Sequence, residues 1–168
     1  MARSNEAHRR FVEETGDMME EHGLSHMAGR VFGALQVCVP PHMSMDELAV
    51  ELQASKGSIS MATRLLLRVG VIEKLSLTGH RRHYYRVRPG VWMSLFAQRT
   101  EHLQQHRELA SLGLAALEGE PIETKERLLE MMVFFDFVEE EMPRIADRWK
   151  TRHPELRKER MKEYEGGS

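Results

Sequence analysis

Apolar residues recur at three- and four-residue spacing along most of the chain, a pattern that predicts a mainly helical protein. Two N-terminal helices are expected over residues 6–22 and 25–39, and Phe11 and Met18 lie near one face of the first. The second should end at Pro40, because proline lacks an amide hydrogen and restricts the residue before it. We interpret both helices as packing elements.

Two short helices joined by a tight turn follow. Ser44 and Glu47 have the spacing of a capping box, which opens a helix over residues 45–52. After a break of three residues, a second helix is expected over residues 56–69, with Ser55 as its N-cap. Its inward residues would be Ile59, Ala62, Leu66 and Val69. This arrangement is typical of a helix-turn-helix.

The period then changes from 3.6 residues to 2. Residues 71–77 and 83–87 alternate as two strands, and the glycine-containing turn between them carries Arg81 and Arg82. A helix-turn-helix followed by a β-hairpin with a basic tip is a winged helix. The fold class is therefore mainly α with a small β-hairpin (α+β).

Two long helices complete the pattern. They are expected over residues 91–117 and 122–149, and Pro143 should kink the second or split it. The tail over residues 151–168 is almost all charge and is expected to fray. These helices carry more apolar surface than a winged helix can cover, which favours a homodimer in which they pack against their symmetry mates. The alternative is that they fold back and complete a monomeric core.

Composition narrows the functions open to this chain. Of its 168 residues, 41% are hydrophobic and 30% charged, a balance that excludes a disordered chain. No apolar run approaches the roughly 20 residues of a membrane-spanning helix, and the polar N-terminus contains no secretory signal. A single cysteine excludes an intramolecular disulfide and a Cys-based zinc site, and it fits a reducing cytoplasm. We find no catalytic constellation, so neither an enzyme nor a cofactor is expected.

The net charge of −2 hides a strong asymmetry. Residues 55–90 hold eight basic side chains against one acidic one, Glu73, so this basic block carries +7 and the remainder −9. A compact basic block in an acidic chain is typical of a surface that binds phosphates. We therefore expect residues 1–90 to be a winged helix-turn-helix DNA-binding domain and residues 91–168 a helical dimerisation region.

The outward face of the second short helix holds the first candidate DNA contacts. Small hydroxyl residues let a helix approach a groove closely, and an arginine can bind guanine O6 and N7 with two hydrogen bonds. These candidates are Ser55, Lys56, Gly57, Ser58, Ser60, Met61 and Arg64. For Ser55 and Ser58, helix capping alone is the alternative role.

The hairpin supplies the other candidate contacts. Arg81 and Arg82 are expected to enter a minor groove or to contact phosphates, and a solubilising turn is the alternative. One of Tyr84 and Tyr85 should face the core while the other hydrogen-bonds a phosphate. The alternation leaves open which does which, and we take Tyr84 as the candidate contact.

Three runs resemble the GbsR branch of the MarR-type regulators. They are GRVFGAL at residues 29–35, MDELAVELQASKGSIS at residues 45–60 and GHRRHYY at residues 79–85. The SKGSxS and GxRxxYY patterns carry most of the weight, and the similarity extends over residues 11–149. The resemblance implies a dimeric bacterial transcription factor on a palindromic operator. Some relatives answer to a small molecule such as choline, but no ligand motif can be matched here.

Other candidate chemistry is weaker. His102 and His106 have the helical spacing of two metal ligands, but no carboxylate or cysteine completes a site locally, so no metal is expected; a third ligand from a dimer interface is the alternative. Cys38 lies beside valines on an apolar helical face, which favours inert burial over redox sensing. A cluster of methionine and phenylalanine over residues 131–137 is interpreted as core, with an adaptable ligand cavity as the alternative.

The sequence thus predicts a homodimeric, sequence-specific transcriptional regulator, with repression favoured over activation. Its expected partners are double-stranded DNA and a second copy of itself, with a small-molecule effector left open and no membrane. The rival hypothesis is a winged-helix protein-interaction module that does not bind DNA. The basic block favours the regulator, because such modules usually lack that charge.

Overall fold

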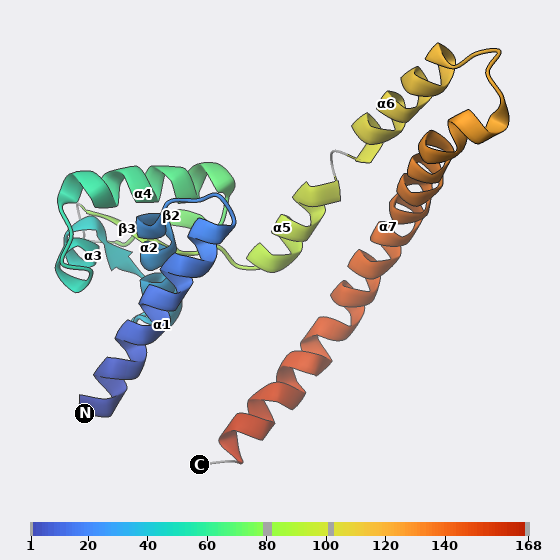
Figure 1. The fold of residues 1–168 in the computed structure, drawn as a ribbon. Coiled ribbons are helices and arrows are strands. Elements are labelled where there is room, and N and C mark those ends of the chain that lie inside the picture. The colour runs from blue at the N-terminus through green and yellow to red at the C-terminus, as the bar shows by residue number, and fades with distance from the viewer. Residues whose placement is uncertain (1, 79–81, 101–102, 167–168) are drawn as a thin grey trace. The chain divides into compact units, whose positions relative to one another are not determined.

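The structure is a computed structural model that describes residues 2–78, 82–100 and 103–166 (Figure 1). The chain divides into two compact units, unit 1 (Met1–Val91) and unit 2 (Trp92–Ser168). Unit 1 contains α1 (Ala2–Glu21), α2 (His26–Val37), β1 (Met43–Ser44), α3 (Met45–Glu51), α4 (Lys56–Val69), β2 (Ile72–Ser76) and β3 (His83–Val87). The fold is mainly helical with a small antiparallel sheet, as predicted.

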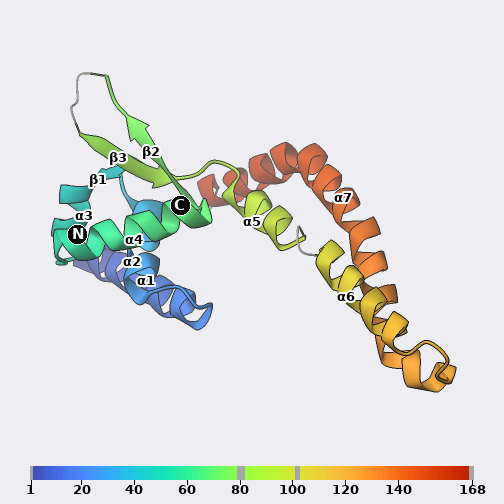
Figure 2. The same cartoon turned by 90° about the horizontal axis from the view of Figure 1, so that it is seen from above.

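The sheet of unit 1 has three strands in the order β1-β3-β2, all antiparallel. The predicted hairpin is confirmed as β2 and β3, which project from the helices (Figure 2). The short strand β1 was not predicted from the sequence. It pairs Met43 with Tyr85 and Ser44 with Tyr84, and so joins the start of the helix-turn-helix to the hairpin.

The predicted helix-turn-helix is confirmed, with α3 ending at Glu51, one residue before its predicted end. The Glu47 amide donates to the Ser44 hydroxyl at 3.3 Å, and the Ser44 amide donates to the Glu47 carboxylate at 2.6 Å, which completes the capping box. Ser55 caps α4 by accepting from the Ser58 amide at 3.2 Å. Gly70 ends α4 with a φ of +78°, a left-handed conformation that glycine adopts without steric cost.

The core of unit 1 lies where α2, α3 and α4 meet the base of the sheet. Its largest fully buried side chains are Phe32, Leu48, Ile59, Leu66, Val31, Val71 and Thr63. The predicted inward stripe of α4 is therefore correct for Ile59, Ala62 and Leu66, while Val69 is only half-buried. Two apolar stripes that face one core bring the two short helices together and leave the opposite side of α4 to solvent.

The inward face of α1 differs from the predicted one. Phe11 and Met18 are 41% and 47% exposed, whereas Val12, Thr15 and Met19 are buried. The cause is the close approach of α2, which packs small residues of the two helices against each other. The contact is closest where Gly29 of α2 meets the backbone of Thr15 and Gly16, so the face of α1 around these two residues packs inward.

Replacing Gly29 by alanine should destabilise unit 1. A Cβ there would lie 2.6 Å from the Thr15 carbonyl oxygen and 2.7 Å from the Gly16 Cα, both backbone atoms that cannot move aside cheaply. We expect a loss of about 1–3 kcal/mol in the free energy of unfolding, measured by urea denaturation. Gly57→Ala is the matched control, since its Cβ would meet only the Ser55 hydroxyl at 3.8 Å. Equal stability of the two variants would contradict the close packing.

Within the residues described, helices are the only regular secondary structure of unit 2. Its helices are α5 (Val91–Thr100), which begins at the end of unit 1, α6 (Leu103–Ala116) and α7 (Ile122–Glu165). The single helix predicted over residues 91–117 is thus described as α5 and α6, on either side of residues 101–102, which lie outside the described residues. α6 and α7 lie side by side (Figures 1 and 2), and Arg107 bridges them through Asp136 and Glu139, each at 2.5 Å.

Of the two outcomes predicted for Pro143, a kink or a split, the split is wrong, and the prediction that the tail frays is wrong as well. α7 runs through Pro143 and Pro154 to Glu165 as one helix. Ion pairs one turn apart support its charged half, including Arg144 with Glu140 at 2.7 Å. Among the described residues, no helix combines the length and the apolarity that a membrane crossing requires.

Candidate nucleic-acid interface

The outer face of α4 is polar, slim and basic. Lys56, Met61 and Arg64 are exposed along it, and Met61 keeps 69% of its surface accessible. Gly57 adds no side chain to the first turn of α4, and the nearest atom that a Cβ there would meet is the Ser55 hydroxyl oxygen at 3.8 Å. The cations and hydroxyls of this outer face are hydrogen-bond donors of the kind that a helix presents to a major groove.

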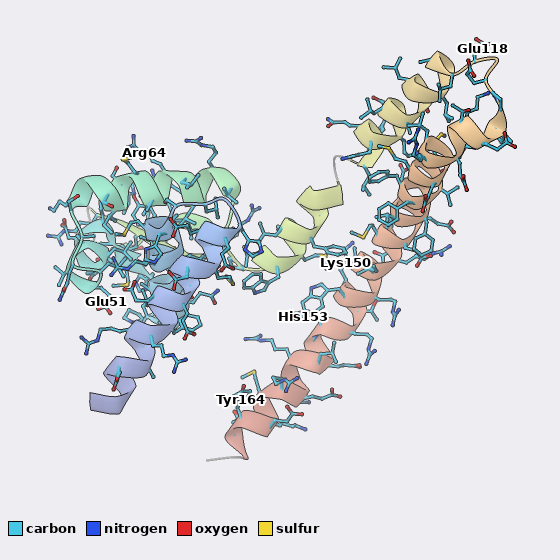
Figure 3. The ribbon with its side chains drawn as sticks, viewed as in Figure 1. Glu51, Arg64, Glu118, Lys150, His153 and Tyr164 are labelled. Atoms are coloured by element: carbon cyan, nitrogen blue, oxygen red, sulfur yellow. The ribbon has the colours of Figure 1, made fainter. Side chains whose placement is uncertain are left out.

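Arg64 projects from α4 on the side away from α1 and α2 (Figure 3). Its Nε donates to the Ser60 carbonyl at 3.2 Å, one turn back along the helix. This exposed bond is easily exchanged for another acceptor, so the guanidinium is available to a base edge. Ser58 and Ser60 are half-buried beside it, and the Ser55 hydroxyl already accepts the Ser58 amide.

The wing and the start of α4 face the same side of unit 1. Asp46, in the first turn of α3, lies 2.6 Å from Lys56 Nζ through Oδ1 and 3.7 Å from Arg82 Nη1 through Oδ2. The Lys56 ammonium hydrogen-bonds the Asp46 carboxylate and holds the pKa of that carboxyl below its usual range, with a smaller contribution from Arg82. One carboxylate therefore brings together a cation of α4 and a cation of the hairpin.

The structure assigns different sides of β3 to the two tyrosines. Tyr85 is 5% exposed and faces the core, and Tyr84 is half-buried with its ring 5.1 Å from the ring of His42. The sequence left open which of the two tyrosines faces the core, and the structure shows that it is Tyr85. Whether Tyr84 also contacts a phosphate stays a prediction.

The predicted contacts fall into three groups. Lys56, Gly57, Met61 and Arg64 share the exposed face of α4, and Arg82 joins them from the wing through Asp46. The serines lie on or beside this face with capping or backbone contacts. Arg81 lies outside the described residues.

Asp46 is the residue that reasoning from the sequence missed. A signal was present in the sequence, because Asp46 is an acidic residue inside the capping box. It lies ten residues before Lys56, the first cation of the basic block. Only the tight turn between α3 and α4 converts that separation into a contact of 2.6 Å.

The structure gives no sign of redox or metal chemistry at the described residues among the weaker candidates, Cys38 and His106. Cys38 is half-buried at the C-terminus of α2, and burial raises the pKa of its thiol, which disfavours the reactive thiolate. The ring of His106 stacks on Phe135 at 4.5 Å, and His102 lies outside the described residues. Within the part of the chain that is described, no three His, Cys, Asp or Glu side chains are grouped to hold a metal ion.

The methionine and phenylalanine cluster of α7 is not buried within the single chain, so its interpretation as core stays a prediction that depends on a second copy. Phe134 and Phe137 are 57% and 62% exposed. Unit 1 contains a cavity of about 550 Å³, which is lined by residues of α1, the α2–β1 connection, α3 and β3. Its lining includes His8, Cys38, His42, Glu47, Glu51 and Tyr84. That volume is within the range of small-molecule sites.

Comparisons with known proteins add a second line of evidence. A family model described as "MmpR5-like MarR family transcriptional regulator" matches residues 90–152. The HTH-type transcriptional regulator MmpR5 of Mycobacterium tuberculosis is 39% identical over 129 residues, 77% of this chain and 78% of that protein. A crystal structure described as that of a transcriptional regulator has a TM-score of 0.70 at 36% identity, and the match covers 87% of this chain and 99% of that one.

Proposed function

The chain belongs to the MarR family of winged-helix transcriptional regulators, and we propose that it binds an inverted-repeat operator as a homodimer. It is a DNA-binding regulator and not an enzyme. Repression is the proposed mode of action, because a dimer seated on an operator within a promoter excludes other proteins from it. The rival hypothesis of an interaction module without DNA binding is not favoured.

The observation that carries the proposal is the shared face of α4 and the wing. Lys56 and Arg82 both contact Asp46, and Arg64 lies eight residues after Lys56 on α4. A helix in the major groove and a hairpin beside it need cations directed to one side, which is the arrangement found here. Arg64 is proposed to read a base, and Lys56 and Arg82 to contact phosphates.

Exposed apolar side chains support the homodimer. No described residue of α7 is buried, and its apolar side chains Val133, Phe134 and Phe137 are 57–68% exposed. On α1, Phe11 and Met18 face outward as well. Exposed apolar surface of this extent marks an interaction site in a soluble protein, and a symmetric second copy offers matching surface.

Finer features of the proposal rest on the sequence. The GbsR branch remains a prediction from the SKGSxS and GxRxxYY patterns, and a cytoplasmic location follows from a chromosomal target. A small-molecule effector is proposed only as a candidate occupant of the cavity between α1, α3 and β3.

Footprinting on the DNA upstream of the protein's own gene and of its neighbours tests the function. The proposal predicts one protected inverted repeat, bound by two chains. Absence of protection, together with equal affinity for all duplexes, would contradict a sequence-specific regulator.

Replacing Arg64 by alanine should lower specificity more than general affinity. Loss of one bidentate base contact is expected to cost about 1–3 kcal/mol of binding free energy on the operator and far less on random DNA. Arg68→Ala is the matched control, since Arg68 is an exposed arginine one turn further along α4. Equal losses of Arg64→Ala on both duplexes would make Arg64 a phosphate contact.

A further inference from the structure

Asp46 occupies an unexpected place in a surface that should attract phosphates. Its carboxylate lies within ion-pair distance of Lys56 and Arg82, the two cations proposed to contact the DNA backbone. The carboxylate is ionised at neutral pH, as an aspartate ordinarily is, and its lowered pKa extends that charge to more acidic pH. A negative charge at this point opposes the approach of a phosphate.

The two ion pairs are weak enough to be exchanged. The side chains of Lys56 and Arg82 are 72% and 68% exposed, and that of Asp46 is 45% exposed. Pairs in such contact with water contribute little to stability, so a phosphate can displace the carboxylate from both cations. The exchange nevertheless leaves Asp46 unpaired beside the DNA backbone.

We propose that Asp46 is an electrostatic brake on DNA affinity, which holds Lys56 and Arg82 in ion pairs that every bound phosphate must displace. The inference rests on the proposed function, in that both cations meet DNA. Because the carboxylate faces the backbone contacts, its effect is the same for operator and random duplexes. It limits sequence-independent binding, which phosphate contacts dominate.

Asp46→Asn tests the brake in the full-length protein. It keeps the size and polarity of the side chain and leaves the Ser44–Glu47 capping box in place. We expect its affinity for the footprinted operator and for a random duplex of equal length to rise by a similar factor, about tenfold. The slope of log affinity against log salt should steepen by about 1 to 2 units, as one opposing charge per subunit is removed.

Two matched variants separate the local pairs from net charge. Glu73→Gln removes the same charge from the basic block but releases Arg86, its partner at 2.6 Å, and should change affinity less than about threefold. Asp46→Glu keeps the charge and should bind as the wild type does. Circular dichroism and the oligomeric state of each variant report whether folding is preserved.

The possible outcomes are distinct. If the wild type binds no DNA, the proposed function fails. If the wild type binds and Asp46→Asn binds equally or more weakly, the brake is wrong, and a weaker operator complex makes Asp46 a positioning residue instead. An equal gain in Glu73→Gln would also overturn the inference, because net charge alone would then explain it.

Discussion

Replacing Phe137 by glutamate should convert the protein from a dimer to a monomer at micromolar concentration. Phe137 is 62% exposed on α7 and lies one turn after Val133, which is 68% exposed, so an apolar strip faces outward there. A glutamate in a dimer interface would bury a charge without a partner. The monomer engages one half-site at a time, so affinity for a full inverted repeat should fall about 100-fold or more.

Sedimentation and operator affinity measured on the same samples check this expectation. Thr124→Glu adds the same charge at another exposed position of α7 and should leave both quantities unchanged. Because Phe137 is exposed within its own chain, the helical content of Phe137→Glu should equal that of the wild type. A wild type that is itself monomeric at micromolar concentration would contradict the proposed assembly.

Replacing Arg81 and Arg82 together by alanine should remove much of the salt dependence of DNA binding. Each phosphate that an arginine neutralises contributes about −0.9 to the slope of log affinity against log salt. Two such contacts per subunit in a dimer amount to a slope that is flatter by about 3 to 4 units, with strongly weakened binding at low salt. Operator affinity across a salt series measures this effect.

The control for the wing removes equal charge elsewhere. Arg127→Ala with Arg152→Ala takes two exposed arginines from α7 and should change the salt slope little. Dimerisation should be the same in all these proteins, since a hairpin tip makes few core contacts. An unchanged slope in the wing variant would mean that the wing does not touch DNA, and the interaction-module hypothesis would regain support.

Local chemistry explains which parts of the fold could be predicted. The capping box of Ser44 and Glu47 and the left-handed Gly70 depend on hydrogen bonds and backbone conformations among near neighbours. Their spacing is visible in the sequence. The hairpin could be predicted for the same reason, because alternation and a glycine-containing turn are local signals.

Features that depend on distant partners could not be predicted. The two residues of β1 have no period of their own and become a strand only by pairing with β3. Similarly, the side of α1 that packs inward is chosen by the glycines of α2, since a Cβ at Gly33 would lie 3.1 Å from the Thr15 Cβ. Asp46 gained its role through a turn that brings α3 against α4.

The tail of α7 was misjudged for a different reason. A run of charges was read as a segment without packing partners, which favours fraying. Charges three or four residues apart on a helix stabilise it without any core, and Arg160 with Glu163 at 2.9 Å is one such pair. The order of the charges, and not their number, carried the information.

Ser44 belongs to two elements at once, since it pairs with Tyr84 in the sheet and caps α3. Separation of β1 from β3 would therefore also disturb the cap of α3. The hairpin and the first helix of the helix-turn-helix are thus expected to open and close as one cooperative unit. Such a unit meets DNA with its wing already aligned, and the entropy of ordering the wing is lost during folding, before the operator is reached.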